Sequence, residues 1–273
     1  MTPDQAKSVR DLLSFYIEAG VDIALDEVPA DRFADPVTLA PQADPAGPAP
    51  AEAPRPRPEP RQAPPIAAHA APPLPEEAIM AARAAARSAE SLEALREIMS
   101  AFDGCALRTT ARQLVFGDGN PQARLMLVGE APGFEEDQVG IPFVGKSGQL
   151  LDKMLAAIGI ARSEAYIANI VPWRPPGNRE PSVHETQICL PFIRRQIELV
   201  DPQILVCLGK PSTATLLGLD GIKRVRGRWV TYKAETRDIR AMPMFHPAYL
   251  LRNPIDKRFA WRDFLAIKRA LAE

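Results

Sequence analysis

Cysteines and long apolar runs are both scarce in this sequence. Its 273 residues include three cysteines, Cys105, Cys189 and Cys207, too few for a disulfide framework. No apolar run approaches the roughly 20 residues that a membrane-spanning helix needs. The first residues also lack the basic and apolar segments of a signal peptide. These absences predict a cytoplasmic protein that makes no membrane contact.

The whole chain has almost no net charge, but its N-terminal and C-terminal parts carry opposite excess charges. The formal net charge is −1. Residues 1–75 carry 6 Lys or Arg against 11 Asp or Glu, whereas residues 120–273 carry 22 against 16. The C-terminal part is therefore modestly basic. Such a balance is compatible with a polyanionic partner, although many enzymes with neutral substrates share it.

The N-terminal part differs in composition from the rest of the chain. Residues 1–28 show helical spacing of apolar side chains and predict an amphipathic helix. Residues 29–75 hold 15 of the 29 prolines and predict a Pro/Ala-rich disordered linker. Together they suggest an arm for an unidentified protein partner, and we expect the protein to be a monomer.

Residues 76–273 predict a single domain of the α/β class. Strand-like and helix-like runs alternate after residue 114, which indicates a three-layer αβα fold with a mostly parallel central sheet. The run at 224–232 around Gly227 predicts a hairpin. The expected strands are 125–128, 166–171, 204–208 and 239–245, and the expected helices are 148–158, 183–199, 212–217 and 256–271.

Polar clusters follow three of the predicted strands. The segment 129–133 reads Gly-Glu-Ala-Pro-Gly and is followed by Glu-Glu-Asp at 135–137 and Pro-Phe-Val-Gly at 142–145. A second cluster spans 169–179, and a third spans 246–252. Open α/β sheets place their chemistry at the carboxyl ends of their strands. We therefore expect the three clusters to form one site.

In these blocks the chain resembles the uracil-DNA glycosylases, most closely the family 4 branch. The blocks are GEAPG, the EED–PFVG stretch, YIANIVPWRPPGNR and MFHPAYLLR, and the resemblance runs from about residue 102 to the C-terminus. It implies a monofunctional base excision repair hydrolase. Such an enzyme flips uracil out of single- or double-stranded DNA and leaves an abasic site. Two alternatives stay open: a sensor that traps uracil-containing DNA with little turnover, and a nucleotide-binding enzyme, which would lack the usual P-loop Lys-Ser/Thr pattern.

The resemblance implies a uracil pocket made by Ala131, Phe143, Asn169 and His246. An extruded base needs an aromatic face, which Phe143 can supply if it is not simply a core residue. The carboxamide of Asn169 matches the O4 and N3–H of uracil, although an Asn at a strand end also caps turns. A donor on His246 can stabilise the negative charge that gathers on the leaving base.

Water activation points to acidic side chains. Glu130 and Glu136 can orient water and stabilise a cationic sugar, and the resemblance adds Asn178. Ala131 stands where the best-known branch has an acid, and Gly133 where that branch has a tyrosine that excludes thymine. Glu136 is a candidate for the wall that replaces the tyrosine. The acidic run around it is also typical of a solvated helix N-terminus.

DNA contacts are expected on three basic or exposed segments. A phosphate can bind amides at a helix start, and basic side chains add salt-dependent affinity. Apolar side chains after His246 can wedge into the space left by a flipped base. The candidates are Lys146, Ser147, Arg224, Arg226, Leu250, Leu251 and Arg252.

The resemblance also implies an iron–sulfur cluster that the sequence does not support. The family pattern has four cysteines, of which only Cys105 and Cys189 are present. Phe102 and Trp173 stand at the other two positions. Two thiolates cannot hold a four-iron cluster. We therefore predict no cofactor and no metal site, with apolar packing in the cluster's place.

Overall fold

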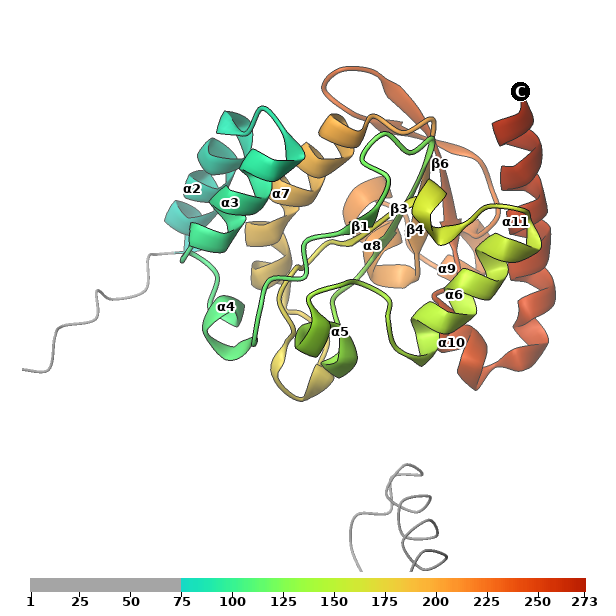
Figure 1. The fold of residues 1–273 in the computed structure, drawn as a ribbon, viewed down its shortest axis with the longest axis horizontal. Helices are drawn as coiled ribbons and strands as arrows, with labels where there is room; N and C mark the ends of the chain where they lie inside the picture. The colour runs from blue at the N-terminus through green and yellow to red at the C-terminus, as the bar shows by residue number, and fades with distance from the viewer. Residues whose placement is uncertain (1–74) are drawn as a thin grey trace, which may run out of the picture. The chain divides into compact units, whose positions relative to one another are not determined.

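A six-stranded sheet forms the centre of the fold in the computed structural model, which describes residues 75–273 (Figure 1). The strand order is β1-β3-β2-β4-β6-β5. Neighbours among β3, β2, β4 and β6 pair in parallel, and both edge strands pair antiparallel. The strands are β1 (Asp118–Gly119), β2 (Leu125–Gly129), β3 (Tyr166–Asn169), β4 (Ile204–Leu208), β5 (Val230–Lys233) and β6 (Asp238–Met244).

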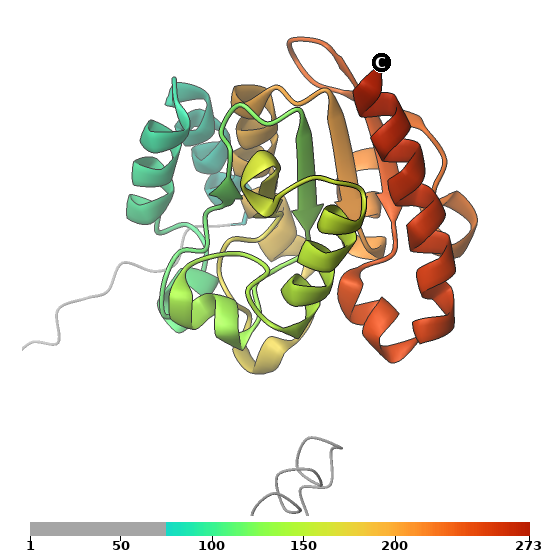
Figure 2. The ribbon, with the colours of Figure 1, turned by 45° about the vertical axis from the view of Figure 1, so that its right-hand side comes forward.

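Helices cover both faces of this sheet, which confirms the predicted three-layer class (Figure 2). On one face lie α2 (Pro75–Ser88), α3 (Leu92–Ala101) and α7 (Val183–Val200), and on the other α6 (Lys146–Ala157) and α11 (Lys257–Ala272). Among the described residues no helix is long and apolar enough to cross a membrane. The shorter elements are α4 (Leu107–Thr110), α5 (Phe134–Val139), α8 (Lys210–Leu217), α9 (Ile222–Val225), α10 (Pro247–Arg252), η1 (Arg162–Glu164), η2 (Pro176–Asn178) and η3 (Pro254–Asp256).

Successive side chains of the central strands pack alternately into two separate hydrophobic cores. Met126 and Val128 of β2 pack in the cluster that contains α2, α3 and α7. Leu125 and Leu127 pack in the cluster that contains α6 and α11. Because successive strand residues point to opposite faces, a strand buried on both sides needs a continuous apolar run, and Leu125–Gly129 is buried throughout.

Local signals explain where α7 begins and ends. The hydroxyl of Ser182 accepts a hydrogen bond from the Glu185 N–H, and the Glu185 carboxylate accepts one from the Ser182 N–H. This reciprocal pair satisfies two amides that the first helical turn leaves free. At the other end Asp201 adopts a left-handed conformation and closes the helix.

The predicted hairpin at 224–232 is wrong in its first half. Residues Ile222–Val225 form α9, which follows the left-handed Gly221, and Gly227 turns the chain into β5. The hairpin is made by β5 and β6, and its turn holds a hydrogen bond from the Ala234 N–H to the Arg237 carbonyl. The predictions for residues 1–28 and for the linker up to residue 74 lie outside the described part of the chain.

Candidate active site

Polar residues come together at the carboxyl ends of three parallel strands. Gly129 ends β2 and pairs in register with Asn169, which ends β3. His246 lies two residues after the end of β6 and caps α10. Phe143 comes from the loop between α5 and α6. The sequence clusters that were expected to converge therefore do so in the structure.

Gly129 leaves room for two side chains to meet above it. A Cβ at this position would lie 2.6 Å from Cζ of Phe143, and it would also collide with Oδ1 of Asn169. Any larger residue would push the aromatic ring and the amide apart. The glycine of the GEAPG block thus allows Phe143 and Asn169 to share one small space.

Phe143 lies beside His246 rather than in solvent. The centroids of the two rings are 5.5 Å apart and their planes differ by 32°. Phe143 is only 5% exposed, and its backbone adopts a left-handed φ of 53°. Phe143 also packs in the core that contains α6, as the alternative interpretation of a core residue expected. The ring forms a wall of the small space above Gly129.

Asn169 has a polar atom that the protein does not satisfy. The residue is 5% exposed, and its Oδ1 is buried without a hydrogen-bond partner among the described residues. Leaving such an acceptor unpaired costs about 1–3 kcal/mol, and native proteins seldom do so without a reason. An amide in this state is suited to binding a ligand that brings its own N–H group.

His246 is held as a neutral donor. Its Nδ1 accepts a hydrogen bond from the Ala248 N–H at 3.1 Å, so the proton of the neutral ring resides on Nε2. Burial lowers the pKa of His246 to about 4, with a further lowering by Arg252 and an opposing effect of Glu136. At neutral pH the ring therefore carries no charge and offers one N–H.

The two candidate acids have different surroundings. The Glu136 carboxylate accepts hydrogen bonds from the N–H groups of Gly133, Val144 and Gly145, each at 3.0 Å. Both of its oxygens are thus engaged with the backbone. Glu130 is partly buried, and burial together with the nearby charge of Glu180 raises its pKa.

Asn178 lies on an exposed turn. It adopts a left-handed φ of 55°, and its Oδ1 accepts a hydrogen bond from Nε of Arg174 at 2.7 Å. The Arg174 guanidinium in turn lies 5.0 Å from the centre of the Phe134 ring. Ala131 is partly buried against the core that contains α7.

The candidate DNA contacts fall into two groups. Leu250 is fully buried in the core that contains α6, so its predicted role as an exposed wedge is wrong. The guanidinium of Arg226 pairs with Asp263 and packs 4.9 Å from the centre of the Phe259 ring. Lys146, Ser147, Arg224, Leu251 and Arg252 lie at least partly at the surface, and Leu251 is 41% exposed.

The residues at the family's cluster positions do not fit an iron–sulfur cluster. Cys105 and Cys189 are both buried, and their thiols share a hydrogen bond. Phe102 packs edge-on against Phe192 with ring centres 5.0 Å apart, and Trp173 is 2% exposed. Within the described residues no group of three or more Cys, His, Asp or Glu could hold a metal ion. Aromatic side chains take the positions that iron ligands would need.

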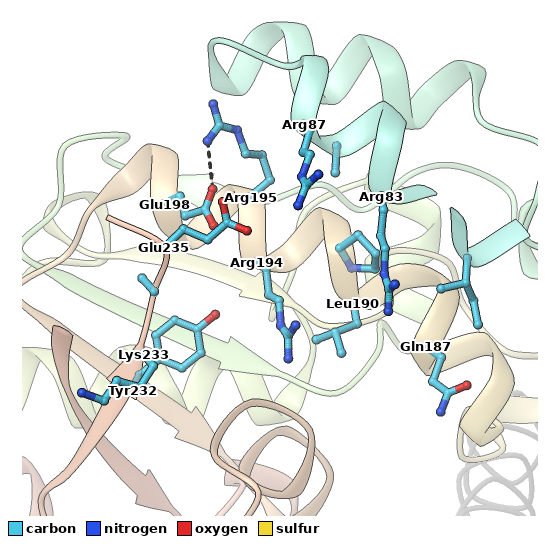
Figure 3. Close-up of a pocket in the computed structure, with 14 residues that line it drawn as sticks. Arg83, Arg87, Gln187, Leu190, Arg194, Arg195, Glu198, Tyr232, Lys233 and Glu235 are labelled. Carbon is cyan, nitrogen blue, oxygen red and sulfur yellow. Dashed lines mark hydrogen bonds and ion pairs between the residues drawn. The ribbon is translucent and has the colours of Figure 1, made fainter. Parts of the chain in front are cut away.

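A hollow of about 880 Å³ lies apart from these residues, between α2, α7 and the β5–β6 turn (Figure 3). Arg83, Arg87 and Arg194 line it, and Arg195 forms an ion pair with Glu198 at 2.8 Å along its wall. None of the residues that converge above Gly129 contributes to it. It therefore offers no histidine or buried amide for the chemistry expected of the site.

One residue that supports the site was not predicted. Arg162 donates hydrogen bonds to the carbonyl oxygens of Pro142 and Phe143. It lies in the short η1 turn, outside the four sequence blocks. The sequence feature that could have pointed to Arg162 is the tight turn around Phe143, because the carbonyl groups of that turn need hydrogen-bond donors from other segments.

Comparison with known proteins places the chain in a family. The model of the uracil DNA glycosylase superfamily matches residues 116–265. The type-4 uracil-DNA glycosylase of Sulfurisphaera tokodaii is 38% identical over 185 residues, which cover 66% of this chain and 84% of the relative. That of Thermotoga maritima is 40% identical over 168 residues, which cover 60% and 85%. Since the family model spans more than half of its residues, the chain belongs to the uracil-DNA glycosylase superfamily and is similar to the type-4 branch.

Proposed function

We propose that this protein hydrolyses the N-glycosidic bond of uracil in DNA and leaves an intact strand with an abasic site. The observation that supports this most directly is the buried, unpaired Oδ1 of Asn169 beside Phe143 and His246. The type-4 uracil-DNA glycosylases that the chain resembles carry this activity in their names. The pocket offers what an extruded pyrimidine needs.

Recognition of uracil follows from the direction of two hydrogen bonds. Oδ1 of Asn169 would accept from the N3–H of uracil, and its amide nitrogen would donate to O4. Cytosine has an unprotonated N3 and an amino group at these atoms, so both pairs would be mismatched and buried. The ring of Phe143 would stack on the base and hold it in the plane of the amide.

Departure of the base requires stabilisation of negative charge. As the glycosidic bond breaks, the electron pair moves onto the uracil ring and partly onto O2. The Nε2–H of His246 would donate to this oxygen. Because the ring is neutral and fixed by Ala248, it is preorganised for this contact, and such donors contribute about 2.7–4 kcal/mol.

Activation of the water that attacks the sugar is assigned to Glu130. The Glu136 carboxylate already accepts three backbone N–H groups, which leaves it little capacity to accept a proton from water. Glu136 instead suits the exclusion of thymine. Its Oε2 would lie 2.8 Å from a Cβ at position 133, so it occupies the space of a side chain there. We assign the exposed Asn178 to orienting the water on the basis of the family resemblance.

DNA binding is assigned to the exposed segments around the site. Lys146 and Ser147 begin α6, Arg224 lies on α9, and Arg252 ends α10. Leu251 is the exposed apolar residue that follows His246 in this helix. We propose that it enters the space left by the flipped base.

The test is a direct assay of product formation. The full-length protein is incubated with single- and double-stranded oligonucleotides that carry one uracil, with matched thymine oligonucleotides as controls. We expect release of free uracil and strand breaks only after alkali treatment. Binding without release of uracil would instead indicate a sensor that traps uracil-containing DNA, and nicking without alkali would contradict a monofunctional mechanism.

A further inference from the structure

We propose that Arg162 is a positioning residue that holds Phe143 in the geometry needed to stack on the extruded base. The inference rests on the proposed function, because it concerns the same pocket. Arg162 does not line the space above Gly129. It acts on the backbone of the loop that carries the aromatic ring.

The Phe143 backbone needs external support. Its φ of 53° lies in the left-handed region, which only three non-glycine residues adopt in the described part of the chain. Asparagine and aspartate enter this region more easily than an aromatic residue does. A conformation of this kind persists when the surrounding structure fixes it, and such residues cluster at functional sites.

Arg162 supplies that support through two adjacent carbonyl groups. Its Nη2 donates to the carbonyl oxygen of Pro142 at 2.6 Å, and its Nη1 donates to that of Phe143 at 3.0 Å. The rigid fork of a guanidinium can bind two neighbouring acceptors at a fixed separation. It therefore fixes the orientation of both peptide groups and not only their distance.

Two carboxylates hold the Arg162 side chain in place. Nε donates to Asp118 at 2.8 Å, and Nη1 donates to Asp152 at 2.9 Å. These acids belong to β1 and α6, elements that are far apart in sequence. The Arg162 side chain is 23% exposed, and those of Asp118 and Asp152 are 33% and 42% exposed. The loop is thereby tied to an edge strand and to a helix.

Glu136 holds the same loop through its backbone N–H groups. It accepts from the N–H groups of Val144 and Gly145, so the carbonyl groups of 142 and 143 and the amides of 144 and 145 are all bound by charged side chains. Gly148 completes the arrangement, because a Cβ there would collide with the Phe143 carbonyl. The loop is thus clamped tightly against α6.

The experiment is a double-mutant cycle on single-turnover uracil excision. The variants are Arg162→Met, Phe143→Ala and the double variant, each in the full-length protein. We expect Arg162→Met alone to slow excision about tenfold to a hundredfold, the range that a small misplacement of a binding group produces. In the Phe143→Ala background the same substitution should have almost no effect, because the ring that it positions is absent.

Arg195→Met is the matched control. Arg195 is also partly buried, bonds the Ala89 carbonyl and pairs with Glu198, but it lies away from the site. We expect it to keep the wild-type rate. If Arg162→Met does not fold, Asp152→Asn removes one anchor of the guanidinium and should give a smaller loss that also vanishes without Phe143.

The outcomes separate this inference from the proposed function. Absence of uracil release by the wild-type protein would refute the function itself. An active wild type in which the Arg162 and Phe143 effects simply multiply would overturn the positioning role. Equal losses in Arg162→Met and Arg195→Met would also overturn it, because they would indicate general destabilisation.

Discussion

At the scale of single residues, the site depends on polar atoms that are fixed before any ligand arrives. The Ala248 N–H determines which nitrogen of His246 carries the proton. Gly129 determines how closely Asn169 and Phe143 approach each other. Electrostatic stabilisation by such preorganised groups is commonly the largest contribution to catalysis. Changes to these atoms should therefore affect the rate far more than the stability.

Asn169→Ala and His246→Ala should each lower the single-turnover rate by about 10²–10³-fold, since each removes a preorganised hydrogen-bonding group. Asn120→Ala is a suitable control, because Asn120 precedes β2 at the opposite edge of the sheet and bonds only the nearby Gln122 N–H through its side chain. Excision rates on a uracil oligonucleotide measure the effect. Near-normal rates in both site variants would refute the assigned roles.

The lowered pKa of His246 predicts an unusual dependence on pH. The folded protein keeps the ring neutral down to about pH 4, so the excision rate should show no His246 step near 6.5. The unfolded chain takes up its proton near 6.5. The stability that this histidine contributes is therefore complete above pH 6.5 and is lost as the pH falls toward 4.

Comparison with His246→Gln isolates these effects. Excision rates and urea midpoints are measured for both proteins between pH 4 and 8, a range set by the ordinary and lowered pKa values. We expect the loss of stability at low pH to be smaller in the variant. A rate step near 6.5 that disappears in His246→Gln would show that the histidine titrates normally.

The sequence indicated which residues converge at the candidate site better than it indicated their surroundings. Asn169, Phe143 and His246 could be assigned because each lies in a local block after a strand. Leu250 could not be separated from Leu251, since only the docking of α10 on α6 decides which of the two is buried. Arg162 was missed because its partners at 118, 142 and 152 come from three separate segments.

At the scale of elements, apolar periodicity predicted the central strands and the long helices well. The segment around Gly227 was less predictable. Its basic residues fit a strand or a helix, and tertiary contacts decide between them. Arg226 pairs with Asp263 of α11, and the Gly227 N–H donates to the Pro243 carbonyl of β6. Neither partner is visible in the local pattern.

The segment that follows β3 should depend on burial of Trp173. This residue is 2% exposed and packs in the same core as Phe192 and Cys189. Trp173→Ala should destabilise the protein by about 3–5 kcal/mol, the range for a buried large aromatic. Trp261→Ala is the control, because Trp261 is 47% exposed. Urea unfolding of both variants provides the comparison, and similar midpoints would contradict the packing role.

At the scale of the whole molecule, we expect residues 75–273, the part that the structure describes, to suffice for catalysis. Both hydrophobic cores, all six strands and every residue assigned to the pocket lie in this part. A chain that begins at Pro75 should therefore keep the single-turnover rate of the full-length protein on a short oligonucleotide. A large loss would show that residues 1–74 contribute to the reaction. An unchanged rate with weaker binding to long DNA would assign them to binding alone.

The presence of an iron–sulfur cluster is also a question about the whole molecule, and we expect that the protein carries none. A four-iron cluster needs about four thiolates or close substitutes. The chain offers Cys105 and Cys189 as an adjacent buried pair, while Cys207 packs within β4. Phe102 and Trp173 cannot ligate iron.

Iron and sulfide analysis of protein prepared without oxygen, together with its visible spectrum, tests this expectation. The double variant Phe102→Cys, Trp173→Cys restores the family's ligand set and provides the positive control. Stoichiometric iron in the unaltered protein would show that the ligand assignment is wrong, whereas iron in the double variant alone would show that two aromatic residues replace the cluster.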